Sequence, residues 1–430
     1  MNKKILHIAI PSILSNLTVP LTGLIATGIA GHLGETYYIG AIAIGALFFN
    51  MIYWIFAFIR LSASGLTAQA YGKQDRKEIT RILVQSLSMS FAISLVLLLL
   101  QYPVERFAFS LLAPTSEVQR YALVFIRILI WGAPATLLLY AFNGWFIGMQ
   151  NAYFATIIII VMNVTNILLC LLFVYRLDMR IEGIAWAALL SQYIAVFMAA
   201  GLWLLKYRSY GKDISLNENF KLSEIKRFFA LNRDIFLRMV CLVAVTFFFV
   251  YAGTAQGDVV LAVNTLMMQL YYLYSFFLDG FALAGEALAG KYAGANDGYR
   301  LKKTIRRLFL WGTGIAVVFT LFFSLEKDLL LTWLTNDAAV IDVCSSYFYW
   351  AAITPLASFV AFIWDGIMIG IMATRYMLIS IAVASFVFFA VFYIFSGNTN
   401  NHVLWGAFIL YLFVRGAVQT GSWCVSLKRL

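Results

Sequence analysis

Residues Asn143–Gly148 have the sequence Asn-Gly-Trp-Phe-Ile-Gly, and residues Asp365–Gly370 have the sequence Asp-Gly-Ile-Met-Ile-Gly. Each glycine of the first stretch has a glycine partner in the second. We call the separation from Asn143 to Asp365 the repeat offset. Gly72–Asp75 and Gly294–Asp297 match at the same offset. Two separate matches at one offset are hard to obtain by chance, so we infer that the chain contains an internal duplication.

The composition surrounding these repeats is too apolar for a water-soluble protein. Of the 430 residues, 63% are hydrophobic and 12% are charged. Soluble domains carry about 25% charged residues, so the charged residues here cannot cover a water-facing surface. This composition excludes an ordinary soluble enzyme, a disordered chain and a nucleic-acid-binding protein. The net charge of +11 is spread between apolar runs, which indicates contact with a membrane surface and not with nucleic acid.

The apolar residues fall into twelve runs, each long enough for a membrane-spanning helix, which needs about 20 residues. The first run follows Lys3 and Lys4 and is too long for a signal peptide, so we expect it to be retained. The runs lie near residues 5–31, 39–70, 79–101, 118–148, 152–174, 182–205, 228–252, 259–290, 302–325, 341–371, 374–396 and 402–426.

Basic residues predict the orientation of these helices. With a cytoplasmic N-terminus, 21 lysines and arginines fall in cytoplasmic segments and only five in the opposite segments. Cytoplasmic loops are enriched in Lys and Arg. We therefore expect both termini to be cytoplasmic, in a multi-pass protein of the plasma (bacterial inner) membrane.

The duplication predicts how the twelve helices are organised. We expect an N-terminal six-helix bundle over 1–205, a cytoplasmic linker over 206–227 and a C-terminal six-helix bundle over 228–430. An even number of spans per copy gives both copies the same orientation, so the repeat axis lies along the membrane normal. Parallel repeats of this kind occur in secondary transporters, with the substrate site near the midplane.

Several short sequence motifs, taken together, resemble those of MATE (multidrug and toxic compound extrusion) transporters, specifically the DinF-like branch. The resemblance covers essentially the whole chain. It rests on Pro11–Pro20, Gly31–Gly34, Gly65–Gly72, Leu231–Arg238, Leu278–Glu286 and Trp364–Gly366.

The resemblance implies two six-helix bundles around a central cavity that opens alternately to the two sides of the membrane. It implies a secondary antiporter that exports drugs or organic metabolites, cationic ones among them, in exchange for H⁺ or Na⁺. We accordingly expect no cofactor beyond the coupling ion, no enzymatic activity, no nucleic-acid partner, and a monomer in the lipid bilayer.

Charged residues inside the predicted helices are the candidates for coupling, because a charge in hydrocarbon costs at least about 2.5 kcal/mol and needs a partner or water. Asp279 and Glu286 are seven residues apart, which places them about 10.5 Å apart on one helix face. Asp365 belongs to another helix of the same half. We expect all three to exchange H⁺ or to hold Na⁺, with Na⁺ at Asp365. The alternative is that Arg238 neutralises one of them as a fixed ion pair.

The sequence departs from the resemblance in its N-terminal half. Many MATE transporters carry one acidic residue in the first helix and another after the asparagines of the fifth helix. Here those positions hold Ala26 and Cys170. We therefore expect coupling to reside in the C-terminal bundle; the alternative is that this chain is weakly coupled or uncoupled.

Polar residues in the N-terminal half are candidates for lining a substrate cavity. Asn163 and Asn166 lie three apart on one helical stripe, and such amides either line a cavity or join helices. Asn143 matches Asp365 across the repeat, and Thr27 follows the missing acidic position.

Prolines inside the predicted helices are candidate kinks, since proline removes one backbone hydrogen bond. They are Pro20, and Pro134 and Pro355, which lie one residue off the repeat offset. A moving gate and a static bend are both open interpretations.

Two other functions would place different demands on the sequence. A flippase for lipids or lipid-linked sugars of the same superfamily would need a cationic cavity, for which Arg60, Arg127 and Arg238 are candidates. An integral-membrane enzyme would need clustered catalytic residues at one membrane face, and the sequence has none. The sequence also lacks a Walker A motif, and its four cysteines and three histidines are too scattered for a metal site or a disulfide framework.

Overall fold

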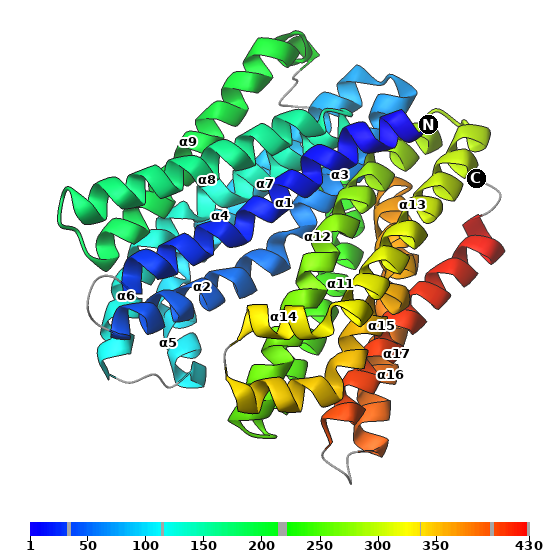
Figure 1. The fold of residues 1–430 in the computed structure, drawn as a ribbon. Helices are drawn as coiled ribbons and strands as arrows, with labels where there is room; N and C mark the ends of the chain where they lie inside the picture. Colours follow the sequence, from blue (N-terminus) through cyan, green and yellow to red (C-terminus); the bar gives the residue numbers. More distant parts are fainter. Residues whose placement is uncertain (32–35, 113–115, 214–221, 336, 396–399, 428–430) are drawn as a thin grey trace. The chain divides into compact units, whose positions relative to one another are not determined.

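A computed structural model describes residues 1–31, 36–112, 116–213, 222–335, 337–395 and 400–427, which form helices joined by short turns (Figure 1). Within these ranges no β-strand occurs, and twelve helical segments are long and apolar enough to cross a membrane. The predicted all-α membrane fold with twelve spans is thereby confirmed. Residues 32–34 of the first-helix motif and 214–221 of the predicted linker lie outside the described ranges.

The helices follow one another with few interruptions. The α-helices are α1 (Asn2–Gly31), α2 (Thr36–Phe56), α3 (Phe58–Lys73), α4 (Arg76–Leu99), α5 (Gln101–Leu112), α6 (Ser116–Leu129), α7 (Ala133–Gly148), α8 (Ala152–Tyr175), α9 (Ile181–Tyr207), α11 (Leu222–Thr254), α12 (Asp258–Gly294), α13 (Gly298–Leu325), α14 (Lys327–Leu334), α15 (Ala338–Gly370), α16 (Thr374–Ile394) and α17 (Asn401–Ser422). Short helical turns are η1 (Ile130–Gly132), η2 (Arg208–Asp213) and η3 (Trp423–Leu427).

The chain divides into two compact units, which we call the N-terminal unit (Leu14–Ala230) and the C-terminal unit (Met1–Ile13 with Leu231–Leu430). The first turns of α1 belong to the C-terminal unit, where Lys4 Nζ donates to the Tyr292 hydroxyl at 3.5 Å. The six-plus-six division at 206–227 stays a prediction. The described part of that segment is the end of α9, then η2, and the first turns of α11.

The repeat is visible in the turns between helices. The turn after α3 places Gln74 in the left-handed region at φ 59°, and the turn after α12 places Asn296 there at φ 54°. The turns after α7 and α15 do the same with Gln150 at φ 63° and Met372 at φ 55°. The members of each pair are separated by the repeat offset. Such a backbone conformation is uncommon for residues other than glycine, so its recurrence at a fixed offset is independent support for the duplication.

The ends of corresponding helices in the two copies are also separated by the repeat offset. It separates the first residues of α4 and α13, the first residues of α8 and α16, and the last residues of α7 and α15. Asp75 and Asp297 are the N-caps of α4 and α13, and each carboxylate accepts from the backbone N–H three residues later, at 3.0 and 2.9 Å. An N-cap carboxylate satisfies one of the free N–H groups at a helix start, so the two copies begin these helices by the same means.

The quoted glycines bring helices into backbone contact. A Cβ at Gly144 would collide with the carbonyl oxygen of Arg60 in α3, and a Cβ at Gly366 would collide with that of Ala282 in α12. Arg60 and Ala282 are themselves separated by the repeat offset. Small residues allow this close approach between membrane helices.

The second glycine of each stretch makes the equivalent contact one turn later. A Cβ at Gly148 would lie 2.7 Å from the carbonyl oxygen of Ser64, and a Cβ at Gly370 would lie 2.5 Å from that of Glu286. The α3–α7 and α12–α15 pairs therefore use one packing arrangement. In it, Glu286 occupies the place that Ser64 holds in the other copy.

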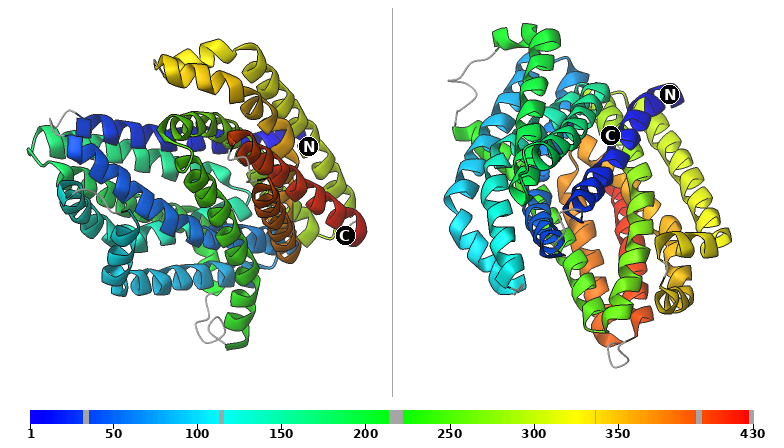
Figure 2. Two further views of the ribbon diagram at one scale, coloured as in Figure 1. Left: turned by 90° about the horizontal axis from the view of Figure 1, so that it is seen from below. Right: turned by 60° about the vertical axis from the view of Figure 1, so that its left-hand side comes forward.

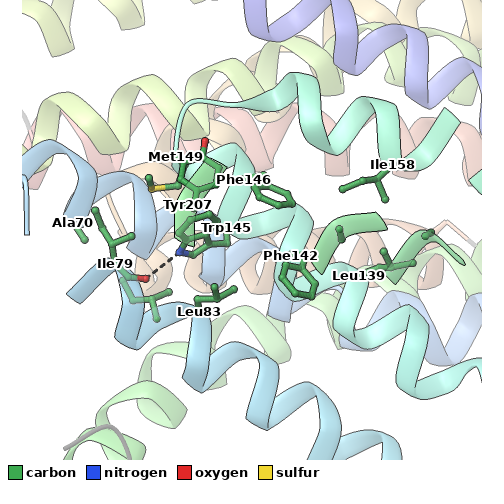
Figure 3. Close-up of a cluster of buried hydrophobic side chains, with 13 residues drawn as sticks. Ala70, Ile79, Leu83, Leu139, Phe142, Trp145, Phe146, Met149, Ile158 and Tyr207 are labelled. Atoms are coloured by element: carbon green, nitrogen blue, oxygen red, sulfur yellow. Dashed lines mark hydrogen bonds between the residues drawn. The ribbon is translucent and has the colours of Figure 1, made fainter. Parts of the chain in front are cut away.

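The core of the N-terminal unit lies beside this contact (Figure 3). Trp145 and Phe146 are fully buried, and the Trp145 indole N–H donates to the carbonyl oxygen of Ile79 at 3.0 Å. The ring of Tyr207, from the end of α9, packs edge-on against Trp145 at 4.9 Å. This cluster joins α4, α7 and α9.

In the C-terminal unit, α15 is the central helix and packs against α12, α13 and α17 (Figure 2). Its middle is buried, and the Tyr274 hydroxyl of α12 donates to the carbonyl oxygen of Pro355 at 3.0 Å. This hydrogen bond joins α12 to the middle of α15. Asp365 lies further along α15 and is buried.

Some details differ from the twelve predicted runs. The run expected over 39–70 is interrupted at Ala57, between α2 and α3, and the run over 118–148 is interrupted by η1. The short helices α5 and α14 were not predicted, because neither is long enough to span a membrane.

Candidate functional site

Asp365 is the centre of a buried hydrogen-bonded cluster in the C-terminal unit. Arg238 of α11 donates from a terminal guanidinium nitrogen to Asp365 Oδ2 at 2.6 Å. Arg415 of α17 donates to the same oxygen, and Gln419 Nε2 donates to Asp365 Oδ1 at 2.7 Å. Each of the four residues is at most 8% exposed. The carboxylate thus accepts from three side chains that come from two other helices.

Local sequence explains how these groups meet. Arg415 and Gln419 are four residues apart, so they project from one face of α17. The neighbouring Trp364 Nε1 donates to Thr420 Oγ1 at 2.8 Å, which also joins α15 to α17. The residue after Asp365, Gly366, lets α15 contact the α12 backbone at Ala282. Asp365 is therefore held between three helices.

Arg238 was expected as a charge partner for one of the carboxylates, and it contacts Asp365. The contacts of Arg415 and Gln419 with Asp365 were not predicted from the sequence. The spacing of four residues between two polar side chains in an apolar helix was the available signal.

The other two candidate carboxylates lie on α12. Glu286 is 2% exposed, whereas Asp279 is half-buried. Both interact electrostatically with Arg238, and Asp279 also interacts with Arg415. Asp279 and Glu286 thus lie within electrostatic range of the two arginines that bind Asp365, and we call these five residues the charge cluster.

The formal charge of this cluster matters because burial makes charges costly. Two arginines and three carboxylates sum to −1 when all are ionised. A buried ion is stable only when it is paired and hydrogen-bonded. One bound proton or one monovalent cation would make the cluster neutral.

The asparagines of the N-terminal unit take part in contacts between helices. Asn163 Nδ2 donates to Thr18 Oγ1 at 2.8 Å, which joins α8 to α1. Asn166 lies one turn further along α8, where its Oδ1 is 3.7 Å from the Cys170 sulfur, and its Nδ2 is 3.5 Å from Ser191 Oγ. The first contact was not predicted, because nothing in the sequence indicates which helix faces Asn163.

Asn143 and Thr27 have different surroundings. Asn143 is 8% exposed, and its Oδ1 accepts no hydrogen bond from the residues that the structure describes. Thr27 is exposed on α1. Asn143 occupies in α7 the position that Asp365 occupies in α15, so the repeat places an amide where the other copy has a charge.

Two of the three prolines lie inside a continuous helix, and the third lies in the first turn of a helix. Helices α1 and α15 continue through Pro20 and Pro355. Pro134 stands in the first turn of α7, directly after η1, where a missing N–H costs little. Their roles as kinks stay a prediction.

Within the described ranges, no three side chains of the types His, Cys, Asp and Glu come together to hold a metal ion. Both oxygens of Asp365 accept from nitrogen donors. A Na⁺ ion there would have to displace at least one of those donors, so this donor set fits an anchored carboxylate better than an open cation site.

The sequence is similar to proteins of one family. The MatE family model matches residues 11–172 and 235–394. DNA damage-inducible protein F of Escherichia coli is 32% identical over 429 residues, which cover 98% of this chain and 92% of the relative. The probable multidrug resistance protein NorM of Acinetobacter baylyi is 22% identical over 273 residues, 62% of this chain and 60% of the relative.

A solved structure has the same fold. A MOP superfamily transporter from Pyrococcus furiosus superimposes with a TM-score of 0.89 at 19% identity, covering 100% of this chain and 96% of that chain. The twelve apolar helices agree with this fold, and the family and its relatives are membrane transporters and not enzymes. The chain belongs to the MatE family.

Proposed function

We propose that this protein is a secondary antiporter that exports drugs or organic metabolites, cationic ones among them, in exchange for H⁺ or Na⁺ by alternating access. Its family membership supports a transport function. The name of the Acinetobacter baylyi relative, a probable multidrug resistance protein, supports an organic substrate. We further propose a monomer in the bacterial inner membrane with both termini cytoplasmic, as the distribution of basic residues predicts.

The observation that carries the coupling proposal is the charge cluster around Asp365, in which four residues are buried and Asp279 is half-buried. It holds three carboxylates and two arginines within one unit, and its formal charge of −1 favours uptake of one proton or one monovalent cation. Carboxylates in a low-dielectric environment can exchange protons near neutral pH. Cation binding would therefore change the charge of a site that α11, α12, α15 and α17 share.

We assign different roles to the three carboxylates. Asp365 is the anchor, because two arginines and Gln419 occupy its oxygens. Asp279 and Glu286 are the exchanging groups, and half-buried Asp279 is the one within reach of water. We propose that Asn143, Asn163, Asn166 and Thr27 contribute to the substrate cavity.

The test is transport in proteoliposomes, with a fluorescent organic cation as substrate and with a pH gradient or a Na⁺ gradient applied separately. We expect one gradient to drive uptake, and we expect Asp279→Asn with Glu286→Gln to abolish that dependence. Glu326→Gln is the matched control, because Glu326 is an exposed carboxylate at a helix end. A double variant that transports at the wild-type rate under both gradients would contradict the assignment. Movement of a labelled lipid in place of the cation would favour a flippase.

A further inference from the structure

The first turns of α13 carry a dense group of basic side chains on one exposed face. Lys302, Lys303, Arg306 and Arg307 line a surface hollow of about 400 Å³ together with Tyr299 and Leu310. Their spacing of three and four residues places all six on one side of the helix. Each of them is exposed. We call this surface the α13 basic face.

The opposite side of α13 fixes the helix in the C-terminal unit. Leu301, Thr304 and Leu308 are fully buried, and the helix packs against α12 and α15. Asp297 caps the helix and pairs with Arg300 at 3.2 Å, so the nearest carboxylate is already engaged. Within the described part of the chain, no carboxylate lies within ion-pair distance of the four cations of the α13 basic face.

The other copy of the repeat has no such surface. The residues that correspond to the four cations at the repeat offset are Thr80, Arg81, Val84 and Gln85 on α4. Arg81 pairs there with Glu78 at 3.0 Å. Thr80 is buried, and its hydroxyl lies 3.3 Å from the carbonyl oxygen of Tyr210, because η2 covers that side of α4. The duplicated fold therefore does not require cations at these four positions.

The α13 basic face continues directly into an apolar one. Further along the same side, Val317 is 41% exposed and Leu321 is 54% exposed, within a helix long and apolar enough to span a membrane. A ligand on this side of α13 therefore meets cations at one end and exposed apolar side chains at the other. An amphiphile with an anionic headgroup and acyl chains is complementary to both.

We propose that the α13 basic face is a binding site for an anionic phospholipid. The two arginines can each bind a phosphate group through two parallel hydrogen bonds, and the lysines add point charges. Basic pockets on membrane helices bind headgroups of this class. Four cations exceed the charge of one phosphodiester, so we infer that a two-phosphate lipid such as cardiolipin binds more tightly than phosphatidylglycerol. The Lys303 ammonium lies over the Tyr299 ring at 5.7 Å, which directs it along this face.

Lipid binding can be measured without transport, so the proposal stands or falls independently of the coupling ion and the substrate. Native mass spectrometry of the purified protein counts bound molecules of cardiolipin, phosphatidylglycerol and phosphatidylethanolamine. The test variant carries Lys302→Gln, Lys303→Gln, Arg306→Gln and Arg307→Gln. The matched control carries Lys73→Gln, Arg76→Gln, Lys77→Gln and Arg81→Gln, which remove the same charge near the repeat-related helix end.

We expect the wild-type protein and the control to retain cardiolipin, and we expect each cation lost from α13 to weaken its binding about fivefold. Binding should also weaken with ionic strength. The proposal is wrong if the α13 variant retains as much cardiolipin as the control, or if the wild-type protein binds phosphatidylethanolamine equally well. Since all four substituted side chains are exposed, an unchanged melting temperature verifies that the variant is folded.

Discussion

One carboxylate oxygen of Asp365 accepts from two buried arginines, Arg238 and Arg415, so the charge of Asp365 contributes directly to their compensation. Removing one partner of a buried ion pair typically costs about 3–5 kcal/mol, because the remaining charge is left in a low-dielectric environment. We expect Asp365→Asn to lower the free energy of unfolding by that amount. Thermal unfolding of the purified protein in detergent measures the effect.

The arginines provide the comparison for that variant. Arg415→Met leaves the contact between Arg238 and Asp365 in place, so it should destabilise the protein less than Asp365→Asn does. If both variants melt at the wild-type temperature, the cluster is solvated in the membrane protein and the role of Asp365 as an anchor is wrong.

How much of this site could be predicted depends on the residue. Asp279, Glu286, Asp365 and Arg238 stand out because charges are rare in apolar helices. The contacts of Asp365 could not be predicted, because they depend on how α11 and α17 are rotated about their axes. Apolar sequence constrains that rotation weakly, since both lipid and neighbouring helices accept the same side chains. For the same reason, Thr18 as the partner of Asn163 was missed.

At the level of helices, the glycine contacts between α12 and α15 make a clear prediction. Gly366→Ala would force its methyl group into the carbonyl oxygen of Ala282, which is backbone and cannot move aside. Overpacking of this kind costs about 1–3 kcal/mol. We expect a lower melting temperature for this variant, and for Gly144→Ala in the α3–α7 pair.

Gly314→Ala is the matched control, because a Cβ at Gly314 of α13 meets no atom within 4 Å. Alanine is favoured over glycine in a helix interior by about 0.8–1 kcal/mol, so this variant should be as stable as the wild-type protein or slightly more stable. Equal melting temperatures for Gly366→Ala and Gly314→Ala would rule out close packing as the reason for the repeated glycines.

The helices themselves were predictable to different degrees. The repeat offset, seen first in four short stretches, extends to turn conformations and helix ends. A duplicated sequence must fold twice, so any local signal in one copy supports the same element in the other. The break at Ala57 has no counterpart in α12, where position 279 continues the helix. The two copies have diverged at that position, so the sequence of one copy cannot predict the helix break in the other.

Considered over all twelve spans, the parallel repeat predicts that corresponding turns face the same side of the membrane. Lys73 and Ala295 are exposed residues at repeat-related turns, whereas Arg176 and Glu326 are exposed at the other ends of the helices. In a variant without native cysteines, a cysteine at either of the first two positions should be shielded in intact bacterial cells from a membrane-impermeant thiol reagent. A cysteine at either of the last two should react.

Labelling of inverted vesicles should give the reverse pattern, which separates membrane side from local burial. The expected sidedness has a direct physical basis, because cytoplasmic segments are enriched in Lys and Arg. Opposite sidedness for Lys73→Cys and Ala295→Cys would mean that an odd number of spans separates them, and the parallel repeat would then be wrong. The same sidedness for both, with reaction from outside the cell, would keep the repeat and invert the predicted orientation. This arrangement also decides whether the α13 basic face, which follows Ala295 in the chain, meets the lipid headgroups of the cytoplasmic leaflet.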